Sequence, residues 1–343
     1  MSERLEDIAA AMVRDGQGIL AADESSGTIK KRFDQIGLES TEDARRDYRE
    51  MMFRADEAMK NYISGVILYD ETIRQKAADG TPLVDLLKAA DAVPGIKVDM
   101  GAKPLALQSG EKVTEGLDGL RERLNEYYKL GARFAKWRAV IEISASTPSH
   151  NAIHANAHAL ARYAALCQEA GIVPIVEPEV LMDGPEASHT IERCFDVTKW
   201  TLNSVFDELY YANVSLEGMI LKPNMVIAGQ KCPTQAPAEQ VAEMTLTCLK
   251  QCVPSAVPGI AFLSGGQSDE DATKHLSLMN AQGGLPWKLT FSYGRALQQA
   301  ALKVWGGKTE NVAAAQRAFT HRAKMNSLAA LGTWSDAAER AAA

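Results

Sequence analysis

The segment Leu216-Glu-Gly-Met-Ile-Leu-Lys-Pro-Asn-Met225 joins a short apolar run to a lysine that immediately precedes a proline. Residues 219–221 are apolar and predict a buried strand, whereas Pro223 removes a backbone donor and keeps Lys222 out of the helical region. We therefore expect Lys222 at the end of a buried strand, where lost hydration favours the neutral, nucleophilic amine. Taken alone the signal is weak, because most lysines at strand ends simply reach solvent.

Similar apolar runs recur on both sides of this segment and alternate with stretches of helical periodicity. The predicted strands are Gly18–Asp23, Ser64–Tyr69, Gly95–Val98, Phe134–Arg138, Val173–Glu177, Gly218–Lys222, Gly259–Ser264 and Leu289–Tyr293. The predicted helices between them include Leu117–Leu130, Asn151–Ala170, Ile191–Tyr211, Ala238–Gln251, Asp269–Met279 and Arg295–Trp305. Strands that alternate with helices indicate βα units and a parallel sheet.

The even spacing of these eight runs, with no linker or repeat between them, favours a closed (β/α)8 TIM barrel. We expect one domain over residues 1–343, with a short tail from about residue 333. Additional helices are predicted at the two ends of the chain, over residues 1–13, 38–60 and 308–330. A doubly wound sheet is the alternative, but no Gly-x-Gly-x-x-Gly turn follows the first strand.

The composition is that of an ordinary globular protein: 343 residues, 46% hydrophobic and 24% charged. A formal net charge of −7 disfavours nonspecific nucleic-acid binding, since that needs a basic face, but it does not exclude small anions. Neither a signal peptide nor a membrane-spanning run is expected. Five scattered cysteines indicate free thiols, so we expect a cytoplasmic protein.

Polar residues end most of the predicted strands. They are Asp23, Glu24 and Ser25 after the first; Lys97 and Asp99 at the third; Lys136 and Arg138 on the fourth; Glu177 and Glu179 on the fifth; and Lys222 after the sixth. In barrel enzymes the chemistry lies at the carboxyl ends of the strands, so these groups are expected to converge. Lysines and carboxylates that lie close together shift one another's pKa values, and such shifts are typical of active sites.

Two glycine-bearing turns follow the seventh and eighth strands, Ser264-Gly-Gly and Ser292-Tyr-Gly-Arg295. Barrels commonly bind phosphate at this position through backbone amides, and the guanidinium of Arg295 adds charged hydrogen-bond donors. The alternative is that these glycines only supply tight turns. The same serine and glycine pattern in both loops favours the phosphate site.

Seven motifs, in order, resemble those of class I fructose-1,6-bisphosphate aldolases, the Schiff-base type that uses no metal. They are Gly18-Ile-Leu-Ala-Ala-Asp-Glu-Ser25, Gly95-Ile-Lys-Val-Asp99, Phe134-Ala-Lys-Trp-Arg138, Val173-Pro-Ile-Val-Glu-Pro-Glu179, Leu221-Lys-Pro-Asn-Met225, Leu263-Ser-Gly-Gly-Gln-Ser268 and Phe291-Ser-Tyr-Gly-Arg-Ala-Leu297. The resemblance runs from about Gly16 to about Gly332. It implies reversible cleavage of fructose 1,6-bisphosphate to dihydroxyacetone phosphate and glyceraldehyde 3-phosphate in glycolysis and gluconeogenesis, by a cytoplasmic homotetramer without cofactor.

The resemblance also implies a role for each site residue. Lys222 forms the imine with the C2 ketone, Glu177 is the acid/base that builds and hydrolyses it, and Asp23 acts at the C4 hydroxyl. Glu179 and Lys136 complete the charge network. The C1 phosphate is assigned to Ser264, Gly265, Gly294 and Arg295, with Ser292 in the same turn, and the C6 phosphate to Ser25, Thr28, Lys97 and Arg138. Arg32 is an extra cation near the barrel mouth.

This chemistry sets expectations for the ionisation of the site. A lysine with an ordinary pKa near 10.4 is neutral at pH 7 at a cost of roughly 4–5 kcal/mol, which burial and the nearby Lys136 are expected to reduce. We further expect burial and the adjacent Glu179 to raise the pKa of Glu177, so that it carries a proton for carbinolamine loss. Asp23 must be ionised to act as a base.

Many members of the family end in a tyrosine that assists proton exchange at C3 of the enamine, and no tyrosine follows Trp334 here. Either another group or water assists this proton exchange, or the sequence is truncated. We expect slower protonation of the enamine and a weaker preference for the bisphosphate substrate.

His150, His154 and His158 recur every four residues and invite a zinc interpretation. No carboxylate or cysteine set completes a tetrahedral site, so a helix face toward solvent or a neighbouring subunit is favoured. A non-catalytic scaffold and a Schiff-base aldolase of other phosphosugars stay open as alternatives.

Overall fold

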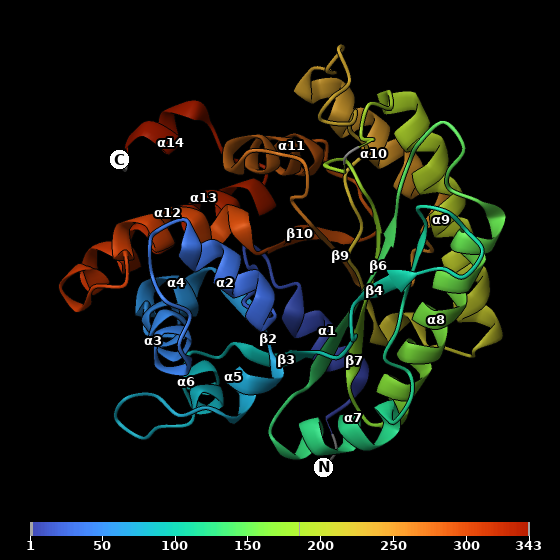
Figure 1. The fold of residues 1–343 in the computed structure, drawn as a ribbon. Helices are drawn as coiled ribbons and strands as arrows, with labels where there is room; N and C mark the ends of the chain where they lie inside the picture. The colour runs from blue at the N-terminus through green and yellow to red at the C-terminus, as the bar shows by residue number, and fades with distance from the viewer. Residues whose placement is uncertain (1–2, 185, 342–343) are drawn as a thin grey trace.

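The computed structural model describes residues 3–184 and 186–341, and its centre is a closed barrel of parallel strands (Figure 1). The order around the barrel is β1-β10-β9-β8-β7-β6-β3-β2. The strands are β1 Gly18–Ala21, β2 Ile63–Leu68, β3 Val93–Lys97, β6 Phe134–Ile141, β7 Val173–Val180, β8 Ile220–Leu221, β9 Gly259–Phe262 and β10 Lys288–Tyr293. This confirms the predicted (β/α)8 barrel and the existence of all eight predicted strands.

Helices surround the barrel, as Figure 1 shows. Those predicted between the strands are α7 Leu120–Lys129, α8 His150–Glu169, α9 Ile191–Tyr211, α10 Ala238–Cys252, α11 Asp269–Ala281 and α12 Arg295–Trp305. The helical segment expected over residues 38–60 forms two helices, α3 Glu42–Phe53 and α4 Asp56–Asn61. The break falls at Arg54 and Ala55, whose backbone leaves the helical region.

Several short elements were not predicted from the sequence. They are the helices α2 Ser26–Asp34, α5 Asp70–Arg74 and α6 Leu83–Ala89, and a hairpin of β4 Ala102–Pro104 and β5 Lys112–Thr114. Helix α2 buries only Ile29 and Phe33, and β4 is exposed throughout. Elements with so few buried side chains leave too weak a hydrophobic period to recognise.

The amino end of the barrel is closed by α1 Leu5–Met12, whose Ile8 and Met12 join a buried cluster with barrel residues such as Ile175 and Ile220. Close packing inside the barrel also fixes Gly95, since a Cβ there would lie 2.2 Å from the ring of Phe134.

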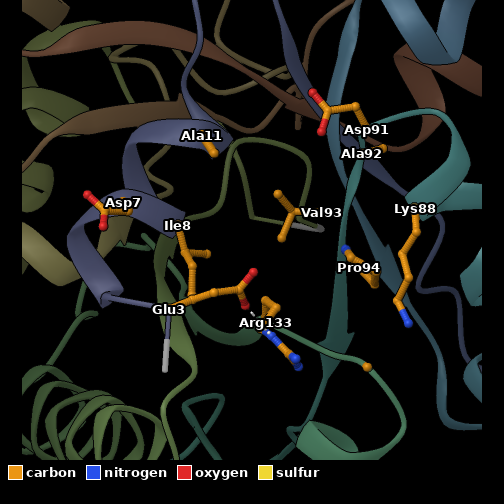
Figure 2. A pocket seen from close by; sticks show the side chains of 11 residues that line it. Glu3, Asp7, Ile8, Ala11, Lys88, Asp91, Ala92, Val93, Pro94 and Arg133 are labelled. Atoms are coloured by element: carbon orange, nitrogen blue, oxygen red, sulfur yellow. Dashed lines mark hydrogen bonds and ion pairs between the residues drawn. The ribbon is translucent and has the colours of Figure 1, made fainter. Parts of the chain in front are cut away.

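A cavity of about 410 Å³ lies beside α1 at this amino end (Figure 2). Its floor is apolar, with Ile8, Val93 and Pro94, and the Nε of Arg133 lies 2.6 Å from a carboxylate oxygen of Glu3. None of the site residues expected from the sequence lines it.

The carboxyl-terminal part of the chain forms α13 Val312–Ala330 and α14 Asp336–Ala341. The expected short tail therefore contains a helix. The carboxylate of Glu339 on α14 accepts a hydrogen bond from the indole of Trp334, contacts His321 at 3.1 Å and forms an ion pair with Arg322. These contacts fasten the last helix to α13. Across the described residues we find no helix with the length and apolar character that a membrane crossing requires.

Candidate active site

A cavity of about 470 Å³ opens at the carboxyl ends of the barrel strands. Every site residue expected from the sequence lines it: Asp23, Ser25, Thr28, Arg32, Lys97, Lys136, Arg138, Glu177, Glu179, Lys222, Ser264, Gly265, Ser292, Gly294 and Arg295. Its other lining residues are Ala21, Glu24, Asp183 and Leu263. The side chains expected to act together thus share one cavity.

Strand register brings the central side chains together. Arg138 on β6 pairs with Glu177 on β7, and Lys222 follows directly after β8. The backbone amide of Lys222 donates to the carbonyl of Val176 at 2.8 Å, so the chain continues alongside β7 past the end of β8. Lys222 is only 4% exposed. The expectation of a lysine at the end of a buried strand is thus confirmed.

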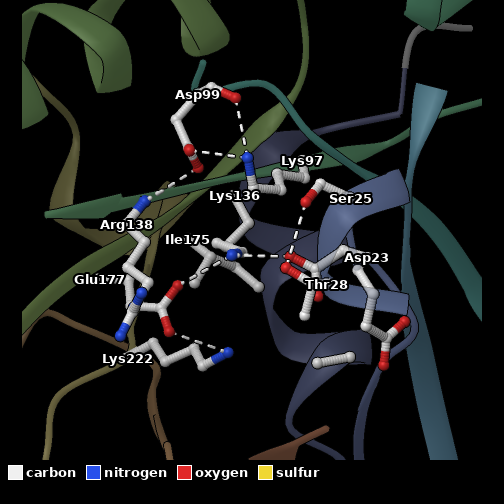
Figure 3. Close-up of polar contacts among 12 residues, drawn as sticks. Asp23, Ser25, Thr28, Lys97, Asp99, Lys136, Arg138, Ile175, Glu177 and Lys222 are labelled. Atoms are coloured by element: carbon white, nitrogen blue, oxygen red, sulfur yellow. Dashed lines mark hydrogen bonds and ion pairs between the residues drawn. The ribbon is translucent and has the colours of Figure 1, made fainter. Parts of the chain in front are cut away.

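Two lysines and two carboxylates form the centre of the site (Figure 3). The Nζ of Lys136 lies 2.7 Å from Asp23 and 3.2 Å from Glu177, and the Nζ of Lys222 lies 3.1 Å from the other oxygen of Glu177. Glu177 therefore bridges the Nζ atoms of two lysines. Because all four side chains are largely buried, their mutual attraction is poorly screened by water.

The expected raised pKa of Glu177 was wrong. Burial does raise the pKa of Glu177, but Lys136, Lys222 and Arg138 outweigh burial and leave the pKa below its ordinary value. Glu179 does not act on Glu177 as expected because its carboxylate forms an ion pair with Arg138. Likewise, burial lowers the pKa of Lys136, but Asp23 and Glu177 more than offset this and raise it. The resting site thus holds an ionised Glu177 beside a charged Lys136.

One side of the cavity consists of the turns after β9 and β10. A Cβ on Gly265 would lie 3.0 Å from Glu179, and one on Gly294 would lie 3.3 Å from the carbonyl of Ala21, so a side chain at either position would force its neighbours to shift. The hydroxyl of Ser292 is buried and has no hydrogen-bond partner among the described residues. A buried donor without a partner, next to two bare glycine turns, suits a phosphate or other anion.

The same cavity carries three cations, each held by a carboxylate. The Nζ of Lys97 lies 2.7 Å from Asp99; Arg32 pairs with Glu24, and Arg138 with Glu179. The hydroxyls of Ser25 and Thr28 lie 3.1 Å apart at the start of α2. Sequence reasoning assigned no role to Glu24 or Asp183. The place of Glu24 at the end of β1 was visible in the sequence, but its pairing with Arg32 was not.

A family model described as fructose-bisphosphate aldolase class-I matches residues 4–343. The chain belongs to this family. A probable class 1 fructose-bisphosphate aldolase of Xanthomonas axonopodis pv. citri is 59% identical, over 97% of this chain and 98% of the relative. The cytoplasmic isozyme 2 of the enzyme from Pisum sativum is 53% identical, over 96% of this chain and 91% of its own.

Among solved structures, fructose-bisphosphate aldolase from Plasmodium falciparum, determined in complex with TRAP and a small-molecule inhibitor, matches with a TM-score of 0.93. The sequences are 50% identical, and the match covers 96% of this chain and 95% of that one. The family and the fold expected from the motifs are thereby confirmed.

The histidine row lies outside the aldolase cavity. His154 and His158 are exposed on α8, and their Nδ1 atoms lie 3.3 and 3.1 Å from the carboxylate of Glu208 on α9. Within residues 3–184 and 186–341, no group of three or more His, Cys, Asp or Glu side chains is arranged to hold a metal ion. The structure gives these histidines the exposed helix face that was expected to meet solvent or a neighbouring subunit. All five cysteines are free and buried.

Asp23 should stabilise this aldolase more at neutral than at acid pH. Burial raises the pKa of Asp23, but Lys136 and Lys222 outweigh it and hold the pKa at about 2, below the ordinary 3.8. A carboxyl group whose pKa is lower in the folded than in the unfolded protein stabilises the folded state above pH 3.8. This stabilisation is lost as the pH falls toward about 2. We expect Asp23 to contribute about 2 kcal/mol to the free energy of unfolding at pH 6 and roughly half of that at pH 3.

The measurement is urea unfolding of the wild type and of Asp23→Asn at both pH values. The difference in free energy of unfolding between the two proteins should shrink as the pH falls. A difference that is the same at pH 6 and pH 3 would contradict the assigned ionisation.

Replacing Gly265 with alanine should weaken binding of the phosphate next to the turn after β9. The new Cβ would lie 3.0 Å from Glu179 and 3.2 Å from Leu263, so the turn or the Glu179 carboxylate must move. We expect the KM for fructose 1,6-bisphosphate to rise by about tenfold, as for a loss of roughly 1–2 kcal/mol of binding. Steady-state kinetics check this. The control is Gly27→Ala on the first turn of α2, where a Cβ meets nothing within 4 Å.

Proposed function

We propose that this chain cleaves fructose 1,6-bisphosphate reversibly to dihydroxyacetone phosphate and glyceraldehyde 3-phosphate through an imine on Lys222. As a member of the class I family it is a fructose-bisphosphate aldolase, a carbon–carbon lyase of glycolysis. The observation that carries the proposal is the buried Nζ of Lys222, which lies 3.1 Å from Glu177 in the cavity that all the residues assigned to the phosphates also line.

Imine formation needs a neutral amine and a group that moves protons. In the proposed step Glu177 accepts a proton from the Lys222 ammonium, and the amine adds to the C2 carbonyl of the substrate. The carbinolamine hydroxyl then leaves as water with a proton from Glu177, and the C=N bond of a protonated imine forms. The lowered pKa of Glu177 keeps the side chain ionised in the resting site, so the step starts from its carboxylate form.

Cleavage then uses Asp23. Its carboxylate takes the proton of the C4 hydroxyl, the C4–O bond becomes a carbonyl, the C3–C4 bond breaks, and its electron pair moves into the imine to give an enamine. A pKa of about 2 keeps Asp23 in the basic form across the physiological range. Lys136 lies between Asp23 and Glu177 and holds both carboxylates in place. Protonation of the enamine at C3 is left without an assigned residue.

Two phosphate sites are proposed to stretch the substrate across the cavity. The C1 phosphate is assigned to Ser264, Gly265, Ser292, Gly294 and Arg295, and the C6 phosphate to Ser25, Thr28, Lys97 and Arg138, with Arg32 as an extra cation near the barrel mouth. The buried Ser292 hydroxyl, which has no partner among the described residues, supports the first assignment, and the cations Lys97 and Arg138 support the second. Binding at both ends fixes the reacting carbons next to Lys222 and Asp23.

The remaining properties are proposed by likeness to relatives. They are a single catalytic domain over residues 1–343 with its tail from about 333, a cytoplasmic homotetramer, and catalysis without a metal or organic cofactor. The names of the Pisum sativum and Arabidopsis thaliana relatives, which place those proteins in the cytoplasm or cytosol, support the location. The ion pair that fastens α14 to α13 supports a single domain. Light scattering of the purified protein tests the tetramer.

The test of the mechanism is trapping of the imine. The protein is incubated with fructose 1,6-bisphosphate and a metal chelator and reduced with borohydride, and adducts are located by peptide mass spectrometry. The expected result is a substrate-dependent adduct on Lys222, with cleavage activity that survives the chelator. No adduct together with activity lost to the chelator would overturn the imine mechanism, and no adduct and no activity would favour a non-catalytic barrel.

A further inference from the structure

His275 on α11 lies outside the active-site cavity and behind the turn that follows β9. It is 8% exposed and does not line the cavity. Its Nδ1 lies 2.7 Å from the side-chain oxygen Oε1 of Gln267, the last residue of the Ser264-Gly-Gly-Gln turn. A buried histidine is thus fastened to the loop that carries half of the proposed C1-phosphate site.

The orientation of the Gln267 amide sets the direction of this hydrogen bond. Its side-chain oxygen faces His275 and accepts, so Nδ1 of His275 is the donor. Burial lowers the pKa of His275 to about 4, so at neutral pH the ring is uncharged and carries its proton on Nδ1. The amide nitrogen Nε2 of Gln267 is buried and has no partner among the described residues. Within this part of the chain, the contact with His275 is the one that orients the Gln267 side chain.

The main chain of Gln267 joins the two halves of the proposed C1-phosphate site. Its backbone amide donates to the carbonyl of Ser264 at 3.3 Å, which closes the turn after β9. Its carbonyl accepts from Nη2 of Arg295, the guanidinium that follows β10. Nη1 of Arg295 lies 4.0 Å from Asp269, at the start of α11. A shift of Gln267 therefore moves Ser264 and Arg295 together.

We propose that His275 is a positioning residue, which sets the affinity for the C1 phosphate by holding Gln267 and, through it, Arg295. The inference rests on the proposed function, since that function assigns the C1 phosphate to Ser264 and Arg295. It predicts an effect limited to one end of the substrate. The cations assigned to the C6 end, Lys97 and Arg138, are held by Asp99 and Glu179, and among the described residues no hydrogen bond or ion pair joins His275 to either carboxylate.

The experiment uses the condensation reaction, in which each phosphate enters on a separate substrate. Dihydroxyacetone phosphate occupies the C1 site, and glyceraldehyde 3-phosphate the C6 site. In His275→Leu we expect the KM for dihydroxyacetone phosphate to rise about three- to tenfold, as for one lost hydrogen bond, with the KM for glyceraldehyde 3-phosphate unchanged. His275→Asn should recover the wild-type value, because the asparagine amide places a donor where Nδ1 lies.

Two further variants make the test robust. Gln267→Met removes the acceptor and leaves His275 in place, so it should reproduce the effect of His275→Leu even if that protein folds poorly. His189→Leu is the matched control, since His189 is equally buried at 8% exposed and does not line the cavity. It should leave both KM values unchanged.

Equal rises in both KM values, or an asparagine variant no better than the leucine variant, would overturn the positioning role. Failure of the proposed function is recognised separately. In that case the wild type itself gives no cleavage and no trapped adduct. Calorimetric titration of wild type and His275→Leu with dihydroxyacetone phosphate then decides the positioning role without turnover: weaker binding by the variant supports it, and equal binding overturns it.

Discussion

Replacing Lys222 with methionine is expected to abolish the borohydride-trapped adduct and to lower kcat for fructose 1,6-bisphosphate cleavage by about 10⁵-fold, the scale seen when a covalent nucleophile is removed. The physical reason is that no other lysine can take the same place. Lys136 is buried nearby, but its Nζ is engaged by both Asp23 and Glu177, which raise its pKa and keep it protonated. An ammonium group has no electron pair with which to attack a carbonyl.

The matched control is Lys303→Met, a lysine that is exposed on α12. This variant should keep wild-type activity and the adduct. Methionine at position 222 also leaves Glu177 with one cation instead of two, so some loss of stability is expected. Circular dichroism and thermal unfolding separate that loss from the chemical one. A folded Lys222→Met protein that still cleaved the substrate at more than about a hundredth of the wild-type rate would contradict the imine on Lys222.

Replacing Asp23 with asparagine should separate the two halves of the reaction. We expect kcat for cleavage to fall by about 10³-fold, within the range for loss of a general base. Trapping of dihydroxyacetone phosphate on Lys222 should persist, because forming that imine needs Glu177 and not a base for the C4 hydroxyl. The measurements are steady-state cleavage and the yield of reduced adduct with dihydroxyacetone phosphate alone.

The control for this prediction is Asp15→Asn, which alters a surface carboxylate paired with Lys288 and should change neither quantity. The asparagine at position 23 leaves Lys136 with Glu177 as its remaining close carboxylate, so the adduct yield reports whether the rest of the network survives. If the adduct were lost in parallel with cleavage, Asp23 would be acting on the imine step or on the network as a whole, and its assignment to the C4 hydroxyl would be wrong.

Much of the site was predictable because a parallel barrel converts order in the chain into proximity in space. Each strand contributes the residues at its carboxyl end, so Asp23, Lys136, Glu177 and Lys222 had to converge once eight strands were recognised. Local signals carried that recognition: apolar runs of strand length, glycine turns, and a proline directly after Lys222. The seven motifs then indicated the family without any coordinates.

What the sequence did not determine depends on which partner each side chain finds. Glu177 and Glu179 lie two residues apart on β7, and adjacency in the chain predicted mutual repulsion and a raised pKa for Glu177. In the tertiary structure Glu179 instead pairs with Arg138, and Glu177 pairs with Lys136 and Lys222. These contacts lower the pKa of Glu177, which is opposite to the predicted direction. Electrostatic shifts follow distances of a few ångströms, and residue order does not contain these distances.

The sequence by itself therefore determined the barrel and the groups at its mouth, because periodicity, turn residues and strand ends are local properties of the chain. The resemblance of its seven motifs indicated the family. The tertiary structure alone decided the break between α3 and α4, the ionisation of Glu177, and the contact from His275 through Gln267 to Arg295. Each of these depends on packing and hydrogen bonding between side chains from different elements, and such contacts exist only once the chain has closed into the barrel.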